Sequence, residues 1–243
     1  MTLQDKVVLI TGAGRGIGKS AALRFAADGA KLALVSRTLS EIEHLRDEII
    51  ASGGTAIAVQ TDITNEEQVN SMVATTEAEL GPIDILINNA GILALKPLIE
   101  TPLDLWNQIL NTNVTGVFLC SKAVMPGMMD RKSGRIINIG SLAGRRGYPE
   151  QGAYCTSKHA LVGLSKVLAV EGQKYGIKVN MVSPGGVLTD LSKGLLGTRS
   201  ASEANEWMTA EEVADGIYYI ATQDGPATTD ELVLRRFASD PWR

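Results

Sequence analysis

The sequence has very few cysteines and histidines, and it lacks any long apolar run. Cys120 and Cys155 are its only cysteines, so both are predicted to be reduced thiols and no disulfide framework is expected. His44 and His159 are its only histidines, and they do not cluster with a cysteine, so no metal site is expected. No segment approaches the ~18 apolar residues that a membrane-spanning helix needs. These absences argue against a disulfide scaffold, a zinc protein and a membrane protein.

An excess of positive charge is also absent. Lys and Arg number 23 against 27 Asp and Glu, which gives a net charge of −4. We therefore expect neither nucleic acid nor an anionic membrane as a partner. The apolar run Val7–Ile10 is too short for the core of a secretion signal, so we expect a cytoplasmic protein. Hydrophobic residues make up 44% of the 243 residues, which suits a single globular domain over residues 1–243.

Short β-branched runs alternate with longer amphipathic stretches along the chain. The runs predict strands at Lys6–Thr11, Lys31–Ser36, Thr55–Gln60, Ile83–Ile87, Arg135–Ile139, Ile177–Val182 and Glu231–Leu234. The stretches predict helices at Ile17–Asp28, Leu39–Ala51, Asn65–Leu80 with Thr64 as its cap, Pro102–Asp130 interrupted at Pro126-Gly127, Gly152–Tyr175 and Thr209–Thr222. This alternation is typical of parallel βαβ units whose sheet is covered on both faces. We therefore predict an α/β protein with a three-layer Rossmann fold, a doubly wound parallel sheet of about seven strands.

One segment has no clear periodicity. Residues 188–207 are rich in Gly, Ser, Ala and Leu and lie between the sixth strand and the last long helix. Loops of this length without secondary structure are often functional. We predict a substrate lid over residues 188–207.

A glycine-rich turn joins the first strand to the first helix. The segment Thr11–Gly18 has the spacing T-G-x-x-x-G-x-G, which departs from the strict G-x-G-x-x-G pattern. Glycines at this place let the backbone approach a pyrophosphate, and the following helix presents free N–H groups to it. The turn therefore predicts a dinucleotide site, with a ligand-free glycine turn as the alternative.

The end of the second strand indicates which dinucleotide binds. A carboxylate there would bond the ribose 2′-hydroxyl of NAD, but this chain has Ser36 and Arg37, and Arg15 lies within the glycine turn. Two guanidiniums without a carboxylate suit the 2′-phosphate of NADP. We expect NADP(H) in preference to NAD(H); the alternative is that both arginines are solvated surface charges.

Tyr154 and Lys158 lie four residues apart on a predicted helix and so share a face. A free tyrosine has a pKa near 10, and a nearby ammonium favours the phenolate. We therefore expect Lys158 to lower the pKa of Tyr154 and to make it a general acid/base for a carbonyl or alcohol. By itself the pair is also compatible with an ordinary exposed pair on a helix.

The chain resembles the short-chain dehydrogenase/reductase family in its single-domain form of about 250 residues. The resemblance covers nearly the whole length and is carried, in the family's order, by Thr11–Gly18, Asp62, Asn88-Asn89-Ala90-Gly91, Asn113, Ser141, Tyr154 with Lys158, and Pro184-Gly185 with Thr189. Each motif alone is only suggestive, but together they are highly specific.

The resemblance implies a role for each of these residues. Tyr154 would be the general acid/base, Ser141 would bond the substrate oxygen, and Lys158 would also hold the nicotinamide ribose. Asn113 would hold a water that links Lys158 to solvent. Asp62 and Ile63 would border the adenine, Asn89 would line the cofactor groove, and Val187 and Thr189 would meet the carboxamide and phosphates. The implied catalytic set is Asn113, Ser141, Tyr154 and Lys158. The implied cofactor-binding set is Gly12, Gly14, Arg15, Gly16, Ile17, Gly18, Ser36, Arg37, Asp62, Ile63, Asn89, Ala90, Gly91, Asn113, Tyr154, Lys158, Pro184, Gly185, Val187 and Thr189.

The substrate is not specified by these motifs. We expect the pocket walls to come from Leu93–Leu95, Leu142–Gln151 and residues 188–207, where Arg145 or Arg146 can clamp an anion or can lie on the surface. The ending Thr229–Arg236 differs from that of the 3-oxoacyl-[acyl-carrier-protein] reductases in the family. A general NADP(H)-dependent carbonyl reductase or alcohol dehydrogenase is therefore the first hypothesis, with the acyl-carrier reductase as the alternative. A non-catalytic NADP(H)-sensing regulator and a structural or partner-binding Rossmann domain are alternatives of other classes.

Family members of this form are commonly homodimers or homotetramers. The resemblance implies that the helices Pro102–Met125 and Gly152–Tyr175 pack across a two-fold axis. Apolar residues recur along the second helix, from Ala160 to Val170, more often than one buried face requires. The alternative is that the helix is simply covered by its own sheet.

Overall fold

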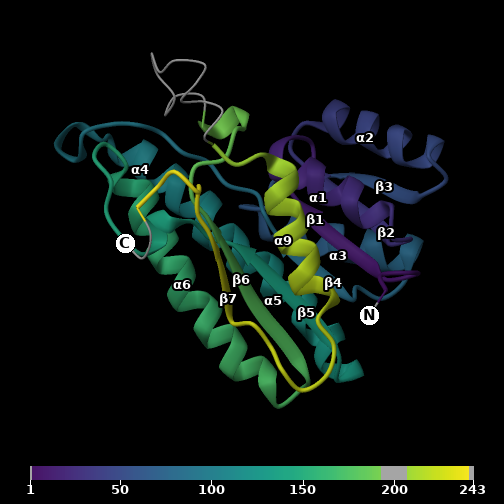
Figure 1. Cartoon of the computed structure of the whole chain (residues 1–243). Coiled ribbons are helices and arrows are strands. Elements are labelled where there is room, and N and C mark those ends of the chain that lie inside the picture. The colour runs from purple at the N-terminus through teal and green to yellow at the C-terminus, as the bar shows by residue number, and fades with distance from the viewer. Residues whose placement is uncertain (1, 193–206, 241–243) are drawn as a thin grey trace.

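The computed structural model describes residues 2–192 and 207–240. Its seven strands form one sheet in the order β3-β2-β1-β4-β5-β6-β7 (Figure 1). Every neighbouring pair of strands is parallel. The strands are β1 (Val7–Thr11), β2 (Lys31–Ser36), β3 (Thr55–Gln60), β4 (Ile85–Asn88), β5 (Gly134–Ile139), β6 (Ile177–Pro184) and β7 (Glu231–Leu234). This order confirms the predicted doubly wound parallel sheet.

Helices cover both faces of the sheet. The first face packs against α1 (Gly16–Ala26), α2 (Leu39–Ala51) and α9 (Ala210–Thr222), and the second against α3 (Glu66–Leu80), α5 (Gly116–Arg131) and α6 (Gly152–Gln173). Successive side chains of β1 point to opposite faces of the sheet. Val8 and Ile10 pack against the first group of helices, and Val7 and Leu9 pack against the second group. The predicted three-layer architecture is therefore confirmed.

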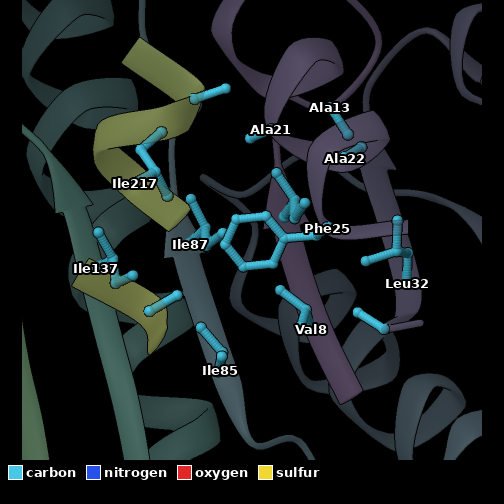
Figure 2. Close-up of a cluster of buried hydrophobic side chains, with 14 of the residues drawn as sticks. Val8, Ala13, Ala21, Ala22, Phe25, Leu32, Ile85, Ile87, Ile137 and Ile217 are labelled. Atoms are coloured by element: carbon cyan, nitrogen blue, oxygen red, sulfur yellow. The ribbon is translucent and has the colours of Figure 1, made fainter. Parts of the chain in front are cut away.

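The core between α1, α9 and the sheet is built around Phe25. Its fully buried ring lies among Val8, Ile87 and Ile217 (Figure 2). The ring of Tyr218 meets it edge to face, with centroids 5.9 Å apart. This packing fixes α1, and with it the glycine turn at the start of α1, against the sheet.

The long helix between β4 and β5 is interrupted at a different place from the one predicted. Pro126 lies inside α5, and the irregular segment is instead a π-helical turn at Asn111–Thr115, between α4 (Leu103–Leu110) and α5. Pro126 has no N–H to donate to the carbonyl of Lys122, four residues earlier. Both residues are exposed, so water can bond that carbonyl and the helix continues. The prediction of a break at Pro126-Gly127 was therefore wrong.

The predicted cap of α3 was also wrong by one residue. The cap is Asn65, whose side chain accepts a hydrogen bond from the Gln68 N–H at 3.0 Å. Thr64 instead donates its hydroxyl and its N–H to Asp62. Because the Thr64 hydroxyl is bonded to Asp62, Thr64 does not cap α3, and the side chain of Asn65 caps the helix instead.

The segment predicted to be a substrate lid falls mostly outside the part of the chain that the structure describes. Most of the expected lid, residues 193–206, lies outside the described residues; Leu188–Ser192 and Trp207 lie within them. Across residues 2–192 and 207–240, no helix is both long and apolar enough to cross a membrane. In the same part of the chain no group of three or more His, Cys, Asp or Glu could hold a metal ion.

The topology positions the site. The chain winds from β1 outward to β3, then returns to β4 on the other side of β1 and winds outward to β7. Loops that leave β1 and β4 therefore diverge at the carboxyl ends of two adjacent strands. Open α/β sheets bind ligands in the crevice formed at such a switch point.

Candidate active site

A cavity of about 440 Å³ lies at the carboxyl ends of the strands. It brings together nearly all of the residues that the sequence predicted for the site. Those that line it are Gly12, Gly14, Arg15, Gly16, Ile17, Ser36, Arg37, Asp62, Ile63, Asn89, Ala90, Gly91, Ser141, Tyr154, Lys158, Pro184, Gly185, Val187 and Thr189. Motifs spread over almost 180 positions therefore meet in one place, because each follows a parallel strand.

Two predicted site residues, Gly18 and Asn113, do not line the cavity. A Cβ at Gly18 would collide with the carbonyl oxygen of Gly12 and would lie 2.6 Å from the Asn89 Nδ2. The absence of a side chain at Gly18 therefore lets α1 pack against the turn. Gly18 therefore shapes the turn that lines the cavity but does not line the cavity itself.

The glycine turn is clamped from the side of β4. Gly12 has a φ of +65°, and a Cβ there would lie 2.8 Å from the Cα of Ala90. The Asn89 side chain donates hydrogen bonds to the carbonyls of Thr11 and Gly12, both at 3.0 Å. The Thr11 hydroxyl accepts from the N–H groups of Asn89 and Ala90, both at 3.1 Å. Asn89 therefore shapes the turn in addition to lining the cavity, a role that its sequence motif did not indicate.

The two predicted arginines, Arg15 and Arg37, line the end of the cavity beside the glycine turn and the end of β2. The Arg37 side chain forms no ion pair with any of residues 2–192 and 207–240, and Arg15 forms only a long pair with Asp190, 3.8 Å, in which both side chains are largely exposed. Such a pair contributes little. Both guanidiniums are therefore available to an anion at the end of β2.

Sequence reasoning missed one carboxylate at this end. Glu41, in the first turn of α2, also lines the cavity, and a Cβ at Gly14 would lie 2.5 Å from its Oε2. Its position four residues beyond Arg37 was visible in the sequence, but only the fold brings it against the glycine turn.

The residues of this half fit a dinucleotide. Gly12 and Gly14 line the cavity with backbone alone, and the N-terminus of α1 follows them directly. The Cγ2 of Thr189 lies 3.2 Å from the place that a Cβ of Gly16 would take, so the segment after β6 closes the turn from the opposite side. Asp62 is held beside the cavity by its bonds to Thr64. Backbone N–H groups beside a glycine cradle are the donor set that a pyrophosphate requires.

The phenol of Tyr154 lies at the inner end of the cavity. Tyr154 is on the first turn of α6, and its phenol lies beside the hydroxyl of Ser141, which follows β5. The Ser141 Oγ also accepts from the Ala143 N–H at 3.1 Å and so caps a short 3₁₀ turn, Leu142–Gly144. The cap fixes the direction of the serine hydroxyl. Two hydroxyls therefore converge where a substrate oxygen can accept from both.

Lys158 reaches the same point one helical turn later. It is buried, its Nζ lies 5.7 Å from the centre of the Tyr154 ring, and it donates to the carbonyl of Ile139 at 2.8 Å. Burial lowers the pKa of Lys158 to about 8. The lysine is therefore still mostly protonated at neutral pH but begins to lose its charge within the physiological range.

The expected direction of the Tyr154 pKa was wrong. Burial raises the pKa of Tyr154 to about 12, and the hydrogen bond from Ser141, which lowers it, is a smaller effect. The spacing of Tyr154 and Lys158 indicated that an ammonium lies near the phenol. It could not indicate that the phenol is buried, and burial disfavours the charged phenolate. The phenol is thus a proton donor over the neutral range.

Asn113 lies in the π-helical turn, and its side chain is fully engaged. Its Nδ2 donates to the carbonyl of Ile92 and to the Ser157 hydroxyl, both at 3.0 Å, and its Oδ1 accepts from the Ile92 N–H at 2.8 Å. The Ser157 hydroxyl in turn donates to the carbonyl of Tyr154 at 2.8 Å. Asn113 therefore ties the loop after β4 to the turn of α6 that carries Tyr154. Its expected part in a proton relay stays a prediction.

The outer wall combines residues from the segments that the sequence predicted with two residues that it did not predict. Leu142, Arg146, Tyr148, Gln151 and Trp207 line the cavity as expected for their segments, while Arg236 and Ser239, beyond β7, line it unexpectedly. Arg145 does not line it, because its side chain forms an ion pair with Glu231. No sequence motif indicated that the chain beyond β7 returns to the site.

Known proteins similar to this chain share one family. The family model for short chain dehydrogenases matches residues 6–199. The 3-oxoacyl-[acyl-carrier-protein] reductase of Synechocystis sp. is 40% identical over 228 residues, covering 93% of this chain and 92% of that protein. The 3-oxoacyl-[acyl-carrier-protein] reductase FabG of Escherichia coli is 36% identical over 238 residues, covering 96% of each.

Solved structures agree with this picture. A short-chain type dehydrogenase/reductase from Mycobacterium marinum has a TM-score of 0.91 and 36% identity, covering 98% of this chain and 97% of that one. A metagenomic short-chain oxidoreductase in complex with NADP has a TM-score of 0.84 and 28% identity, covering 98% and 100%. ElxO with NADP bound has a TM-score of 0.85 and 34% identity, covering 95% and 96%.

Proposed function

This chain belongs to the short-chain dehydrogenase/reductase family of oxidoreductases, and we propose that it transfers a hydride between NADP(H) and a ketone or secondary alcohol. The observation that carries the proposal is the meeting of the Tyr154 phenol, the Ser141 hydroxyl and Lys158 at the inner end of a cavity whose other end is a glycine cradle. A binding protein that only senses NADP(H) has no need for this trio.

The protein's own groups supply the proton and the orientation. When bound, the reduced cofactor supplies a hydride to the carbonyl carbon. Ser141 donates a hydrogen bond that orients the carbonyl oxygen, and Tyr154 gives that oxygen its phenolic proton. Lys158, charged at neutral pH, favours the phenolate that remains. In the reverse direction the same phenolate accepts the alcohol proton.

The lowered pKa of Lys158 predicts the pH dependence of carbonyl reduction. Because burial places this pKa at about 8, the ammonium loses its proton as the pH rises through that value. Tyr154, with its pKa raised to about 12, stays protonated in this range and does not limit the reaction. We expect kcat/KM for reduction to be level below about pH 7 and to fall above about pH 8. A profile that stays level to about pH 10 would show that the charge of Lys158 is not required.

We propose NADP(H) as the cofactor because two guanidiniums, Arg15 and Arg37, line the end of the cavity beside β2. Glu41 lies on the same side but against Gly14. Two similar structures are of proteins bound to NADP. A charge-assisted bond from Arg37 to the 2′-phosphate would contribute about tenfold to affinity.

Steady-state kinetics with NADPH and NADH test this assignment together with the activity. The wild type is expected to prefer NADPH, and Arg37→Gln is expected to reduce that preference about tenfold. Arg46→Gln is the matched control, since Arg46 lies on α2 and pairs with Asp47 outside the cavity. Preference for NADH by the wild type would refute the assignment.

A second candidate function is reduction of a 3-oxoacyl group on an acyl carrier protein. The curated relatives with that name are 36–40% identical and cover nearly the whole chain. The feature of this chain that counts against it is the ending Thr229–Arg236, which differs from the ending of those reductases. Rates with acetoacetyl thioesters and with simple ketones, measured side by side, separate the two candidates.

We also propose that the protein is a homodimer or homotetramer. Phe118 of α5 and Val167 and Val170 of α6 are 44%, 53% and 75% exposed. Leu161 and Leu168 on the same α6 helix are buried against its own sheet. The apolar face that remains is suited to a second copy of the chain.

A further inference from the structure

The chain beyond β7 forms a compact turn at the carboxyl end of the sheet (Figure 1). We call residues 235–239 the C-terminal turn. The Arg235 Nη1 donates to the carbonyls of Arg236, Phe237 and Ser239 at 3.0, 3.0 and 2.8 Å. The N–H and hydroxyl of Ser239 both donate to the Arg236 carbonyl. One arginine, Arg235, therefore holds the turn, and the next, Arg236, is left to face the cavity.

The C-terminal turn lies close to the reacting hydroxyls. The Gly185 N–H donates to the carbonyl of Leu234 at 2.8 Å. A Cβ at Gly185 would lie 3.1 Å from the Cδ1 of Leu142 and 3.8 Å from the Cα of Arg235. Leu142 directly follows Ser141 in the chain. Arg236 therefore belongs to the substrate end of the cavity and not to the glycine-turn end.

Trp207 gives the Arg236 side chain a fixed platform. The guanidinium carbon lies 5.2 Å from the centre of the Trp207 ring. The ring is 8% exposed and packs against Gly186, where a Cβ would lie 2.9 Å from the ring atom Cε3. Stacking on an aromatic ring leaves the edge of a guanidinium, with its N–H donors, free to bind an anion. In the described part of the chain Arg236 forms no ion pair.

The charges around Arg236 are unbalanced. Arg146 also lines this end, where its Nε donates to the Tyr148 hydroxyl at 2.7 Å. The carboxylates that line the cavity, among residues 2–192 and 207–240, are Glu41 beside Gly14, Asp62 bonded to Thr64, and Asp190 near Arg15. All three lie at the glycine-turn end, so the described residues that line the substrate end include two guanidiniums and no carboxylate.

We propose that Arg236, with Arg146 as a second cation, binds a negatively charged group of the carbonyl substrate, a carboxylate or a phosphate. This inference rests on the proposed function, because it names the class of substrate that the same site reduces. It assigns specificity to a segment beyond β7 that none of the motifs covers. The anion would place the carbonyl beside Ser141 and Tyr154.

Two matched substrate pairs test the inference and separate the two anions. Acetoacetate is compared with acetoacetamide, and S-acetoacetyl-4′-phosphopantetheine with S-acetoacetylpantetheine, each with NADPH. The readout is the ratio of kcat/KM for the charged member to that for the neutral member. We expect Arg236→Gln to lower this ratio about tenfold in at least one pair, and Arg236→Lys to keep part of it.

Arg145→Gln is the matched control. It removes the same charge from the neighbouring surface, where Arg145 pairs with Glu231 and does not line the cavity. Its ratio should equal that of the wild type in both pairs. NADPH binding, followed by nicotinamide fluorescence, should be unchanged in Arg236→Gln, which shows that the variant is folded.

The outcomes separate this inference from the proposed function. A drop confined to the first pair supports a carboxylate, and one confined to the second supports a phosphate. If both ratios stay constant while the wild type reduces the neutral members, the inference is overturned and the proposed function stands. If the wild type reduces none of the four compounds, the proposed function fails and the inference fails with it.

Discussion

Replacing Tyr154 with phenylalanine is expected to lower kcat for carbonyl reduction by ~10²–10⁴-fold. The substitution removes one oxygen from a buried ring and keeps its shape, so the packing of α6 against the short turn after Ser141 should persist. The proton donor is lost, and water cannot replace it readily because the side chain is only 9% exposed. NADPH affinity should change little, since the glycine cradle is untouched. Stopped-flow or steady-state NADPH oxidation together with a fluorescence titration measures both quantities.

Tyr175→Phe is the control for this variant. Tyr175 lies just beyond the opposite end of α6 and packs against the second layer of the core. Its loss of a hydroxyl should leave kcat within about twofold of the wild type, because Tyr175 does not line the cavity. If Tyr154→Phe also remains within that range, Tyr154 is not the general acid and the mechanism given above is wrong.

Gly12→Ala should lower kcat/KM for NADPH by about 10²-fold, the scale expected when a substrate-positioning element moves by about 1 Å. The new Cβ would lie 2.8 Å from the backbone of Ala90, which cannot move without moving Asn89 and its bonds to the turn. The φ of +65° adds strain for any residue with a side chain. The turn must therefore shift, and the pyrophosphate site shifts with it. Kinetics at varied NADPH, with thermal unfolding in parallel, measures the effect.

Gly53→Ala separates backbone strain from displacement of the turn. Gly53 follows α2 with a φ of +85°, but a Cβ there meets nothing within 4 Å. The control should lose ~1 kcal/mol of stability, as expected for left-handed backbone, and keep the wild-type kcat/KM. Equal kinetic losses in the two variants would mean that strain alone, and not the contact with Ala90, explains the effect.

The sequence predicted the sheet and the motif residues well because both are local patterns. β2, α2, β3 and β7 have the bounds that periodicity and glycine stops indicated. In a parallel sheet the residues that follow each strand meet at one edge, which predicts Ser141 at the site, whereas the pairing of Ser141 with Tyr154 came from the family resemblance. Gly12 was identifiable for the same reason, since its turn follows a strand and precedes a helix.

What the sequence did not show depends on tertiary packing. Glu41 reaches the glycine turn and Arg236 reaches the substrate end only because α2 and the segment beyond β7 fold back over the sheet. The pKa of Tyr154 was predicted in the wrong direction because a spacing reports the neighbouring ammonium but not the loss of solvent. The π-helical turn around Asn113 likewise follows from its contacts with Ile92 and Ser157, which lie far away in the chain.

Transfer of an isotope from the cofactor would show whether a hydride passes from NADPH to the substrate in this cavity. A ketone that the protein reduces is incubated with NADPH deuterated at C4 of the nicotinamide ring, one stereoisomer at a time, and the alcohol is analysed by mass spectrometry. We expect one deuterium on the carbinol carbon from one stereoisomer and none from the other, because a bound nicotinamide ring would present only one of its faces to the ketone beside Tyr154. An alcohol without deuterium from either stereoisomer would contradict hydride transfer in this cavity.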